Sequence, residues 1–369
     1  MFIDRRQLLK AGVAATAAAA LSSTARAEVG FSPRPGAWRN FLVSARVAIV
    51  GAEGQTQAWI PLPAVNEQDW SRSLSSEWTS NGRATLAREP KYGASMLHVE
   101  WADGEPNPAV EVSSRIATRD RAVDFATREQ PAPLSAEERE LFTQGTELIP
   151  VDGIVKQTSD KIIATADAKT DIEKARGIYE WIVDSTFRDA KVRGCGIGDI
   201  ASMLRTGNLG GKCADLNGLY VGLARAASLP ARDLYGIRLA PSKFGYKSLG
   251  TASNVISKAQ HCRAEVYLTG FGWVPVDAAD VRKVVLEEPP TNLAIDNPMV
   301  VAVRKALFGA WEGNWLAYNF AHDVELPGSH GPKLGFFMYP QAETAGRRLD
   351  PLDPDHFAYT IIAKEISAA

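Results

Sequence analysis

The 369-residue sequence lacks any long hydrophobic run. A membrane-spanning helix needs about 18 consecutive apolar residues, and the nearest approach is the alanine-rich stretch 11–21. Charge of one sign is also not in excess, because 41 Lys and Arg stand against 43 Asp and Glu. The absence of a long apolar run argues against a membrane span. The chain also has no stripe of Lys and Arg, which argues against binding to nucleic acid or anionic membranes.

Nucleotide and zinc motifs are missing as well. The glycine-rich segment 207–212 is similar to a phosphate-binding loop, but that motif requires Gly where Thr206 stands and Ser or Thr where Cys213 stands. Segment 194–198 does not open a helix as a dinucleotide-binding motif must, so we interpret it as a turn. There is no Gly-x-Ser-x-Gly elbow and no His-Glu-x-x-His helix. The sequence therefore predicts no cofactor.

The first 27 residues have the order of an export signal. Arg5 and Arg6 precede a short, weakly apolar run, and Ala25-Arg26-Ala27 is typical of a cleavage site. The paired arginines resemble the twin-arginine type, which is an address and not an anchor. The alternative, an alanine-rich helix of the folded domain, does not require this order. We expect a periplasmic or otherwise exported mature chain of 342 residues.

The mature length suggests about two domains. Residues 38–130 contain short alternating apolar runs bounded by turn residues, which predicts a small antiparallel β domain. Asn81-Gly82 lies between two such runs as the turn of a two-residue hairpin would, and His98 is interpreted as a structural histidine. Residues 134–290 are expected to form a catalytic core, and residues 291–369 an extension that completes it.

The core region reads as helices followed by strands. Ser135 with Glu138, and Thr170 with Glu173, fit the capping box that starts a helix. Apolar residues at helical spacing and at strand spacing predict the following elements: helices at 170–187 and 213–227, and strands at 232–239, 260–268, 273–276 and 357–362. This order is α+β, because a parallel sheet would need alternating strands and helices.

A thiol stands at the predicted start of the second helix. The N-terminus of a helix stabilises the thiolate form of a residue such as Cys213, and the attacking thiolate needs an acid for the leaving group. Of five histidines, only His261 begins a strand close after this helix, and Asp277 ends the next strand. A simple hairpin at 270–272 would leave these two residues roughly 13 Å apart along the sheet. Spacing alone therefore does not establish a Cys-His-Asp triad.

Three sequence blocks carry a resemblance. They are Gly-Gly-Lys-Cys-Ala-Asp-Leu at 210–216, Leu-Pro-Ala-Arg at 229–232, and His-Cys-Arg-Ala-Glu-Val-Tyr at 261–267 with Gly-Trp-Val-Pro-Val-Asp at 272–277. In this order they resemble the bacterial transglutaminase-like superfamily, over about a third of the chain. The resemblance implies a papain-like core, with helices packed on an antiparallel sheet.

The same resemblance implies a role for each of three residues. Cys213 would be the nucleophile, His261 the general base and acid, and Asp277 the group that orients the imidazole. Cys262 and Arg263 depart from the family pattern, in which a small residue and an aromatic often stand at these positions. These departures affect the expected substrate contacts more than the triad.

Several alternatives stay open at this level. The second oxyanion donor beside the Cys213 amide could come from Trp181, Asn208 or Gln260. Cys195 and Cys262 could form a disulfide near the site or be two unpaired buried thiols.

Two further alternatives concern the C-terminal part of the sequence. His322, Asp323 and His330 could bind a metal, but we interpret them as solvent-facing loop residues and predict no metal site. The aromatic residues between 311 and 339 could line a substrate groove or belong to the core.

The sequence thus predicts an exported thiol enzyme that acts on amide or peptide bonds of a protein or peptide substrate, with cell-wall peptide among the candidates. A peptidase or amidase is preferred. One alternative is a transglutaminase that cross-links proteins through a lysine amine. The other is a catalytically silent binding module.

Overall fold

The computed structural model describes residues 30–129 and 131–367. The described residues from Phe31 onward form one compact unit. The expected export signal, residues 1–27, lies outside the described residues. Within the described part of the chain, no helix combines the length and the apolar character that crossing a membrane requires.

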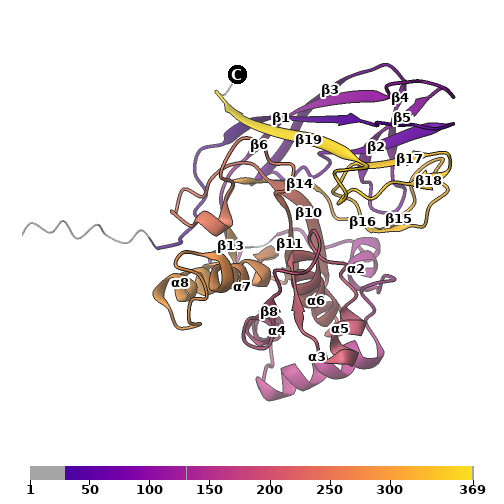
Figure 1. Ribbon diagram of the computed structural model, residues 1–369. Coiled ribbons are helices and arrows are strands. Elements are labelled where there is room, and N and C mark those ends of the chain that lie inside the picture. Colours follow the sequence, from indigo (N-terminus) through magenta and orange to yellow (C-terminus); the bar gives the residue numbers. More distant parts are fainter. Residues whose placement is uncertain (1–29, 130, 368–369) are drawn as a thin grey trace, which may run out of the picture. The chain divides into compact units, whose positions relative to one another are not determined.

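The N-terminal strands form two antiparallel sheets that share a core (Figure 1). The first sheet has the order β19-β1-β6-β3, with bounds β1 Arg39–Ala48, β3 Ser71–Ser80, β6 Ala109–Thr118 and β19 Ala358–Ile366. The second has the order β18-β17-β2-β5-β4, with bounds β2 Thr56–Leu62, β4 Arg83–Arg88, β5 Ser95–Trp101, β17 Gln341–Thr344 and β18 Arg347–Arg348. In β1 every second side chain from Phe41 to Val47 is buried, so the alternating pattern that predicted a β domain here is confirmed.

The expected hairpin at Asn81-Gly82 is wrong. Strand β3 before it pairs with β6 in one sheet, whereas β4 after it pairs with β5 in the other. Neither residue has the positive φ that a type I′ turn needs. Instead, the Asn81 side chain accepts a hydrogen bond from Trp101 Nε1 at 2.7 Å and donates one to the Asn107 carbonyl at 2.9 Å. These bonds hold the chain where it crosses between sheets.

A third antiparallel sheet forms the centre of the core region, with the order β12-β11-β10-β14. Its strands are β10 Ala231–Arg238, β11 Gln260–Leu268, β12 Gly272–Val276 and β14 Trp315–Asn319. The helices that accompany it are α2 Ala136–Thr143, α3 Gly153–Thr165, α4 Asp171–Ser185, α5 Ile200–Thr206, α6 Cys213–Ala226, α7 Ala278–Glu287 and α8 Pro298–Ala306, with a 3-10 turn η1 Lys247–Leu249. This arrangement confirms the α+β class, the papain-like core and the preceding small β domain.

Helix α6 is the centre of this region (Figure 1). All fourteen of its residues are buried, because α3 and α4 pack on it and the sheet strands β10 and β11 cover it. Capping boxes at Ser135 and Thr170 start α2 and α4 as predicted. Three pairs of short strands join loops around the core: β7 Arg121–Ala122 with β13 Ala310–Trp311, β8 Phe187–Arg188 with β9 Gly210–Gly211, and β15 His322–Val324 with β16 Leu334–Phe336.

The segment 291–369 serves more than one sheet. It contributes β14 to the central sheet, but β17 pairs with β2 and β19 pairs with β1. The segment therefore closes the N-terminal sheets as well as the central one, which the expected extension of the core did not include. Most of its aromatic side chains are core residues, among them Trp311, Trp315 and Phe337.

Candidate active site

Cys213 is the first residue of α6, and hydrogen bonds to the Asp215 carboxylate fix the start of this helix. The Asp215 carboxylate accepts a hydrogen bond from the Lys212 amide at 2.9 Å, and from the amides of Ile197 and Gly198 at 3.0 and 2.8 Å. It thereby ties the turn 194–198 to the helix. The Cys213 amide lies in the first turn, where a helix provides no acceptor for it.

The turn 194–198 brings a second thiol to the site. Gly194, Gly196 and Gly198 all have positive φ, and a Cβ on Gly196 would lie 1.8 Å from Asp215 Oδ2. Only glycine fits this close approach. The interpretation of this segment as a turn is confirmed, and its backbone is bonded to α6 because the Ala214 amide donates to the Cys195 carbonyl at 2.9 Å.

The other two predicted site residues are in direct contact. Asp277 Oδ2 lies 2.7 Å from His261 Nε2. Strand β12 pairs with β11 so that Val276 faces Ala264, which leaves Asp277 two positions from His261 and not four. Asp277 is also the N-cap of α7, and its carboxylate accepts from the Asp280 amide at 3.0 Å. The Asp277 contact uses Nε2 of the imidazole, which leaves Nδ1 for Cys213.

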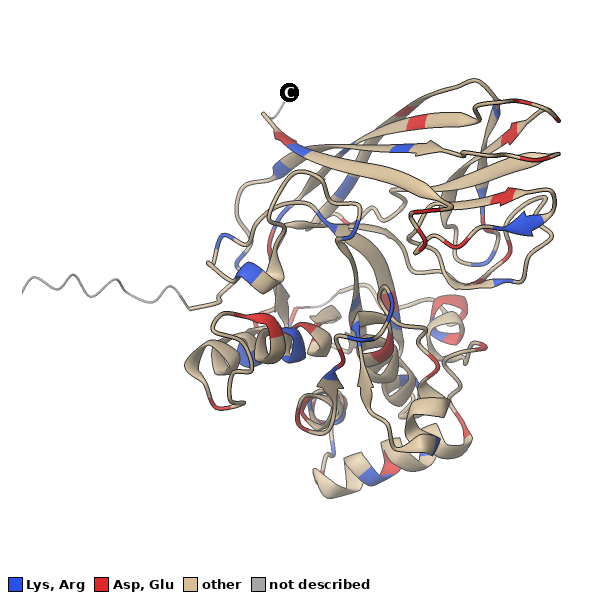
Figure 2. Cartoon of the chain, in the orientation of Figure 1, with Lys and Arg blue, Asp and Glu red and all other residues tan. Residues whose placement is uncertain are grey.

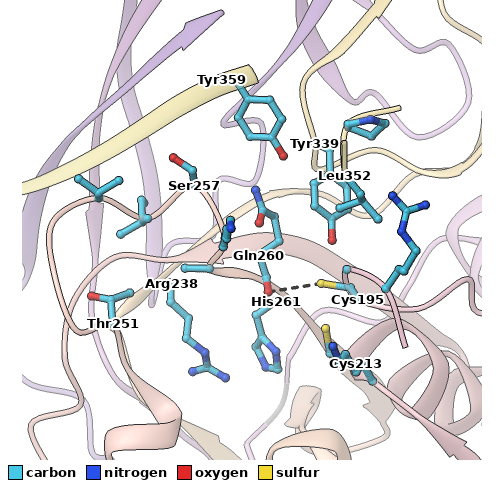
Figure 3. A pocket seen from close by; sticks show the side chains of 18 of the residues that line it. Cys195, Cys213, Arg238, Thr251, Ser257, Gln260, His261, Tyr339, Leu352 and Tyr359 are labelled. Carbon is cyan, nitrogen blue, oxygen red and sulfur yellow. Dashed lines mark hydrogen bonds between the residues drawn. The ribbon is translucent and has the colours of Figure 1, made fainter. Parts of the chain in front are cut away.

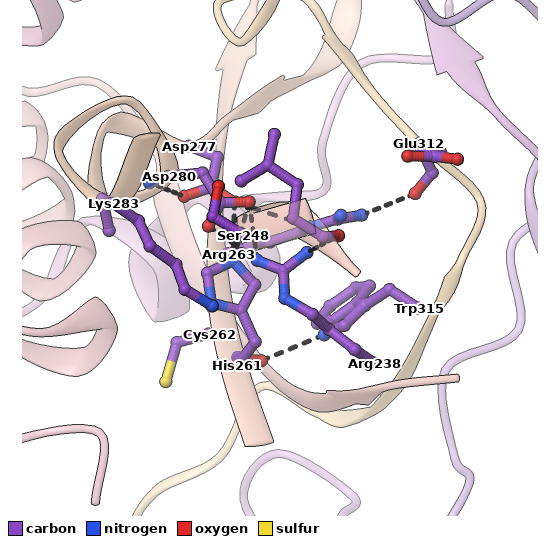
Figure 4. A network of polar contacts seen from close by, with 12 residues as sticks. Arg238, Ser248, His261, Cys262, Arg263, Asp277, Asp280, Lys283, Glu312 and Trp315 are labelled. Atoms are coloured by element: carbon purple, nitrogen blue, oxygen red, sulfur yellow. Dashed lines mark hydrogen bonds and ion pairs between the residues drawn. The ribbon is translucent and has the colours of Figure 1, made fainter. Parts of the chain in front are cut away.

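A polar network fixes this pair (Figure 4). Asn217, one turn after Cys213 on α6, donates to Asp277 Oδ1 at 3.0 Å and to the Cys262 carbonyl at 2.9 Å. Arg238 donates two hydrogen bonds to Asp280 at 2.6 and 2.7 Å, and Asp280 Oδ2 lies 3.5 Å from His261 Nε2. Every member of this network is buried.

Sequence reasoning missed Asn217, Arg238 and Asp280. One signal could have found Asn217, because it is an amide four residues after Cys213, on the same face of a largely apolar helix. Arg238 and Asp280 meet across 42 residues, and no local pattern predicts such a pair.

The electrostatics favour a thiolate facing an imidazolium. Burial raises the pKa of the Cys213 thiol, but hydrogen bonds with Cys195, Cys262 and His261 and the charge on His261 outweigh burial and hold the pKa well below its usual value. Burial and Arg238 lower the pKa of His261, but the carboxylates of Asp280 and Asp277 outweigh them and raise it. The two shifts together stabilise the ion pair.

All three cysteines gather here as free thiols. The sulfur atoms of Cys195, Cys213 and Cys262 lie within 4.8 Å of one another, and no disulfide joins Cys195 to Cys262. The hydrogen bond with Cys213 raises the pKa of Cys195, and burial raises that of Cys262. The structure therefore has the two unpaired buried cysteines of the alternative interpretation, and Cys213 is the one of the three thiols whose pKa is lowered.

A cleft of about 690 Å³ opens over these groups (Figure 3). Cys213 and His261 line it although they are only 4% and 3% exposed. The loop 250–260 forms one wall, and residues between 339 and 359 form the opposite wall. Figure 3 shows Tyr339, Leu352 and Tyr359 facing this space, so part of the C-terminal segment belongs to the cleft.

One of the three candidates for the second oxyanion donor lines the cleft. Gln260 contributes to its lining, and Gln260 Nε2 has no hydrogen-bond partner in the described structure. Asn208 and Trp181 do not line the cleft. Asn208 accepts from the Gly210 amide at 3.2 Å, and Trp181 packs against the core formed with α6. An unpaired amide N–H in the lining of this cleft makes Gln260 the candidate that we retain as the second oxyanion donor.

The alternative metal ligands are not assembled. Among the described residues, two groups have three potential metal ligands within reach of one ion, namely the three thiols and His261 with Asp277 and Asp280. His330 is exposed, whereas His322 is buried, so the interpretation of His322 as solvent-facing is wrong. His322 Nε2 lies 3.5 Å from a carboxylate oxygen of Asp233, itself buried without a hydrogen-bond partner.

His98 has the structural role expected of it. Its Nε2 lies 2.9 Å from Gln57 Oε1, and its ring stacks on Trp59 at 5.3 Å between centroids.

Comparisons with known proteins show a family and a fold for this chain. Residues 156–278 match the model of the transglutaminase-like superfamily. An uncharacterized protein of Haemophilus influenzae is 38% identical over 331 residues, which are 86% of this chain and 88% of that protein. The crystal structure of a "putative cysteine protease" from Cytophaga hutchinsonii covers 89% of this chain and 99% of its own, at 13% identity and a TM-score of 0.51. At that identity the likeness is one of fold.

Proposed function

Because the chain belongs to the transglutaminase-like superfamily, we propose that it is a thiol enzyme that breaks amide or peptide bonds through a thioester on Cys213. One observation carries the proposal. His261 lines the same cleft as a thiol whose pKa is lowered, and the buried Asp277 carboxylate holds His261 Nε2 at 2.7 Å. A nucleophile, a base and an orienting acid in one cleft are the requirements of acyl transfer.

The first half-reaction follows from the ion pair. The Cys213 thiolate attacks the carbonyl carbon of the substrate, and the oxyanion that forms is held by the Cys213 amide and by Gln260 Nε2. His261 then gives its proton to the leaving nitrogen, so the C–N bond breaks and the amine departs. The acyl group remains on sulfur as a thioester, and Asp277 keeps the imidazole oriented throughout.

The second half-reaction decides between hydrolysis and cross-linking. Neutral His261 takes a proton from the acceptor, which attacks the thioester and regenerates the thiolate and the imidazolium. Six Lys and Arg side chains and no Asp or Glu line the cleft, and they would repel the ammonium group of an approaching lysine. Water is therefore the favoured acceptor, and we place the protein with the peptidases or amidases.

A peptide library tests the proposal. We expect wild-type protein to give hydrolysed products that Cys213→Ala does not give, and His261→Ala to lose activity while the exposed His330→Ala retains it. Addition of a primary alkylamine identifies the acceptor, because amine adducts in the mass spectrum would indicate transamidation. Identical spectra for wild type and Cys213→Ala under all conditions would mean that the protein is a silent binding module.

We also propose that the protein acts after export. The support is the order of charges, apolar residues and small residues in the first 27 positions. N-terminal sequencing of the protein recovered from the periplasmic fraction tests it, and a mature chain starting at Glu28 is expected. An intact N-terminus in the cytoplasmic fraction would contradict it.

A further inference from the structure

All charged Lys, Arg, Asp and Glu side chains that line the cleft are cations. Of its 26 residues, six are Lys or Arg and none is Asp or Glu. The whole chain has more acidic than basic side chains, with a formal net charge of −2, so the cleft departs from the average of the molecule. Figure 3 shows the Arg238 side chain reaching toward the floor of this cleft.

Some of these charges are already neutralised by acids behind the cleft. Arg238 is paired with Asp280 at 2.6 Å, and Arg193 with Asp350 at 2.9 Å. Two further cations share one partner, because Arg188 Nε contacts Glu287 while Lys283 Nζ lies 3.8 Å from the same carboxylate. Three acids therefore contact four of the six cations and offset three of their charges.

The remaining two, Lys212 and Lys258, have no ion pair within the described structure. The cleft thus has a net excess of three positive charges, to which the Cys213–His261 ion pair adds nothing.

The two unpaired lysines line the cleft and lie close in sequence to Cys213 and His261. Lys212 is the N-cap of α6, directly before Cys213, and Lys258 is exposed on the loop three residues before His261. The N-terminus of α6 adds a partial positive charge on the side of Lys212. A narrow site lined by charge of one sign concentrates ligands of the other sign.

We infer that the cleft selects an acyl donor with free carboxylates close to the bond that is attacked, that is, an acidic peptide. This inference rests on the proposed function for its chemistry, but its electrostatic basis is independent of turnover. Apolar side chains of the same cleft, such as Val255, Leu352 and Tyr359, would contact the aliphatic parts of such a peptide. An acidic donor places its carboxylates against the two lysines that the protein itself leaves unpaired.

Binding to Cys213→Ala tests the inference without any need for catalysis. The probes are three pools of dansyl-labelled, end-capped peptides of equal length. Each peptide has an amide-bearing residue at its centre, and the residues beside it are Glu in the first pool, Gln in the second and Lys in the third. We expect the Glu pool to bind about tenfold more tightly than the Gln pool at low salt, and the Lys pool to bind most weakly. The preference should shrink as salt rises to about 0.5 M. Equal affinity for the three pools, or no binding of the Glu pool, overturns the inference.

Charge variants locate the effect. In the Cys213→Ala background, Lys258→Glu and Lys212→Gln should each reduce the preference for the Glu pool about threefold. The matched control is Lys305→Glu on α8, because Lys305 is exposed and does not line the cleft. A reduction of the same size in Lys305→Glu would assign the preference to overall charge and reject the cleft.

Turnover of the same pools by wild-type protein separates this inference from the proposed function. Cleavage without a charge preference rejects only the inference. Selective binding without cleavage by the wild type rejects only the enzymatic function.

Discussion

Asn217 Nδ2 lies 3.0 Å from Asp277 Oδ1 and so joins the helix that begins at Cys213 to the acid proposed to orient His261. The same nitrogen donates to the carbonyl of Cys262, the residue after the base. Ala279, in the first turn of α7, donates its amide to Asn217 Oδ1 at 3.3 Å. One buried side chain therefore fixes the relative positions of α6, β11 and α7, which carry the three proposed catalytic residues.

Replacement of Asn217 by alanine should change the pH dependence of the reaction. Asp277 loses a donor that favours its charged form, so it stabilises the imidazolium of His261 less and the pKa of His261 falls. The alkaline limb of kcat/KM against pH should move to lower pH, and kcat should fall about tenfold. Peptide hydrolysis measured between pH 5 and 9 checks both expectations.

A second buried residue controls for lost stability in this experiment. Ser159 on α3 donates to the Leu223 carbonyl at 2.8 Å, away from the cleft. Ser159→Ala should cost about 1–3 kcal/mol of unfolding free energy, as Asn217→Ala should, without shifting the pH profile. If the pH profile shifted equally in Ser159→Ala and Asn217→Ala, the role of Asn217 would be structural only.

Alkylation should distinguish Cys213 from the other two thiols. At pH 6 we expect iodoacetamide to modify Cys213 alone, because its pKa is lowered whereas those of Cys195 and Cys262 are raised. In His261→Ala the burial of the thiol remains but a hydrogen bond and a charge are lost, so the rate at pH 6 should fall at least about tenfold. Mass spectrometry of tryptic peptides reports each site separately.

The same samples count the free thiols. After denaturation without reductant, all three cysteines should be alkylated, since all are free in the structure. Equal labelling of the three at pH 6 in the folded protein would argue against a selectively ionised Cys213.

Gln260 should act mainly on the rate and little on binding. Its unpaired Nε2 is proposed to bond the oxyanion and not the ground-state carbonyl, so Gln260→Ala should lower kcat about 100- to 1000-fold with a small change in KM. Asn208→Ala is the comparison, because Asn208 is exposed and lies outside the cleft. Full activity in Gln260→Ala would remove it from the mechanism.

Asp233 should make the protein less stable at alkaline pH. Burial raises its pKa to about 7, above the value near 4 of an unfolded chain. Between pH 4 and pH 7 the folded protein therefore binds one proton at Asp233 that the unfolded chain has released. The stability that this proton contributes is fully present below pH 4 and is lost as pH rises through 7. The loss is on the order of 4 kcal/mol.

Asp233→Asn removes the ionisation and tests this sign. Urea unfolding at pH 5 and pH 8 should show a smaller difference between the two pH values in Asp233→Asn than in wild type, with the variant the more stable of the two at pH 8. A wild-type protein that gains stability between pH 5 and 8 through this residue would reverse the argument.

Local signals in the sequence predicted the elements that carry the site. The capping box at Thr170 and the apolar spacing after Cys213 mark α4 and α6 within one or two residues of their observed ends. Such signals depend on residues three or four positions apart, and the structure preserves them. The resemblance to a family added the pairing of His261 with Asp277.

Contacts between distant segments were beyond local patterns. Two short runs around Asn81 look like one hairpin, but their partners β6 and β5 come later in the chain and draw them into different sheets. The gathering of Cys195 with Cys213 depends on a glycine turn folded onto Asp215. In both cases the deciding interaction joins segments that are distant in sequence. The sequence therefore predicts each segment but not the contact between them.

Strand β19 pairs along its length with β1, and Tyr359 within it lines the cleft. The ribosome synthesises a chain from its N-terminus, so some three hundred residues are added after β1 before its partner β19 exists. The thiol of Cys213 likewise exists for roughly 140 residues of synthesis before the second wall of its cleft is complete. A ribosome-bound chain that has not yet exposed β19 would therefore carry Cys213 beside a cleft that still lacks Tyr359.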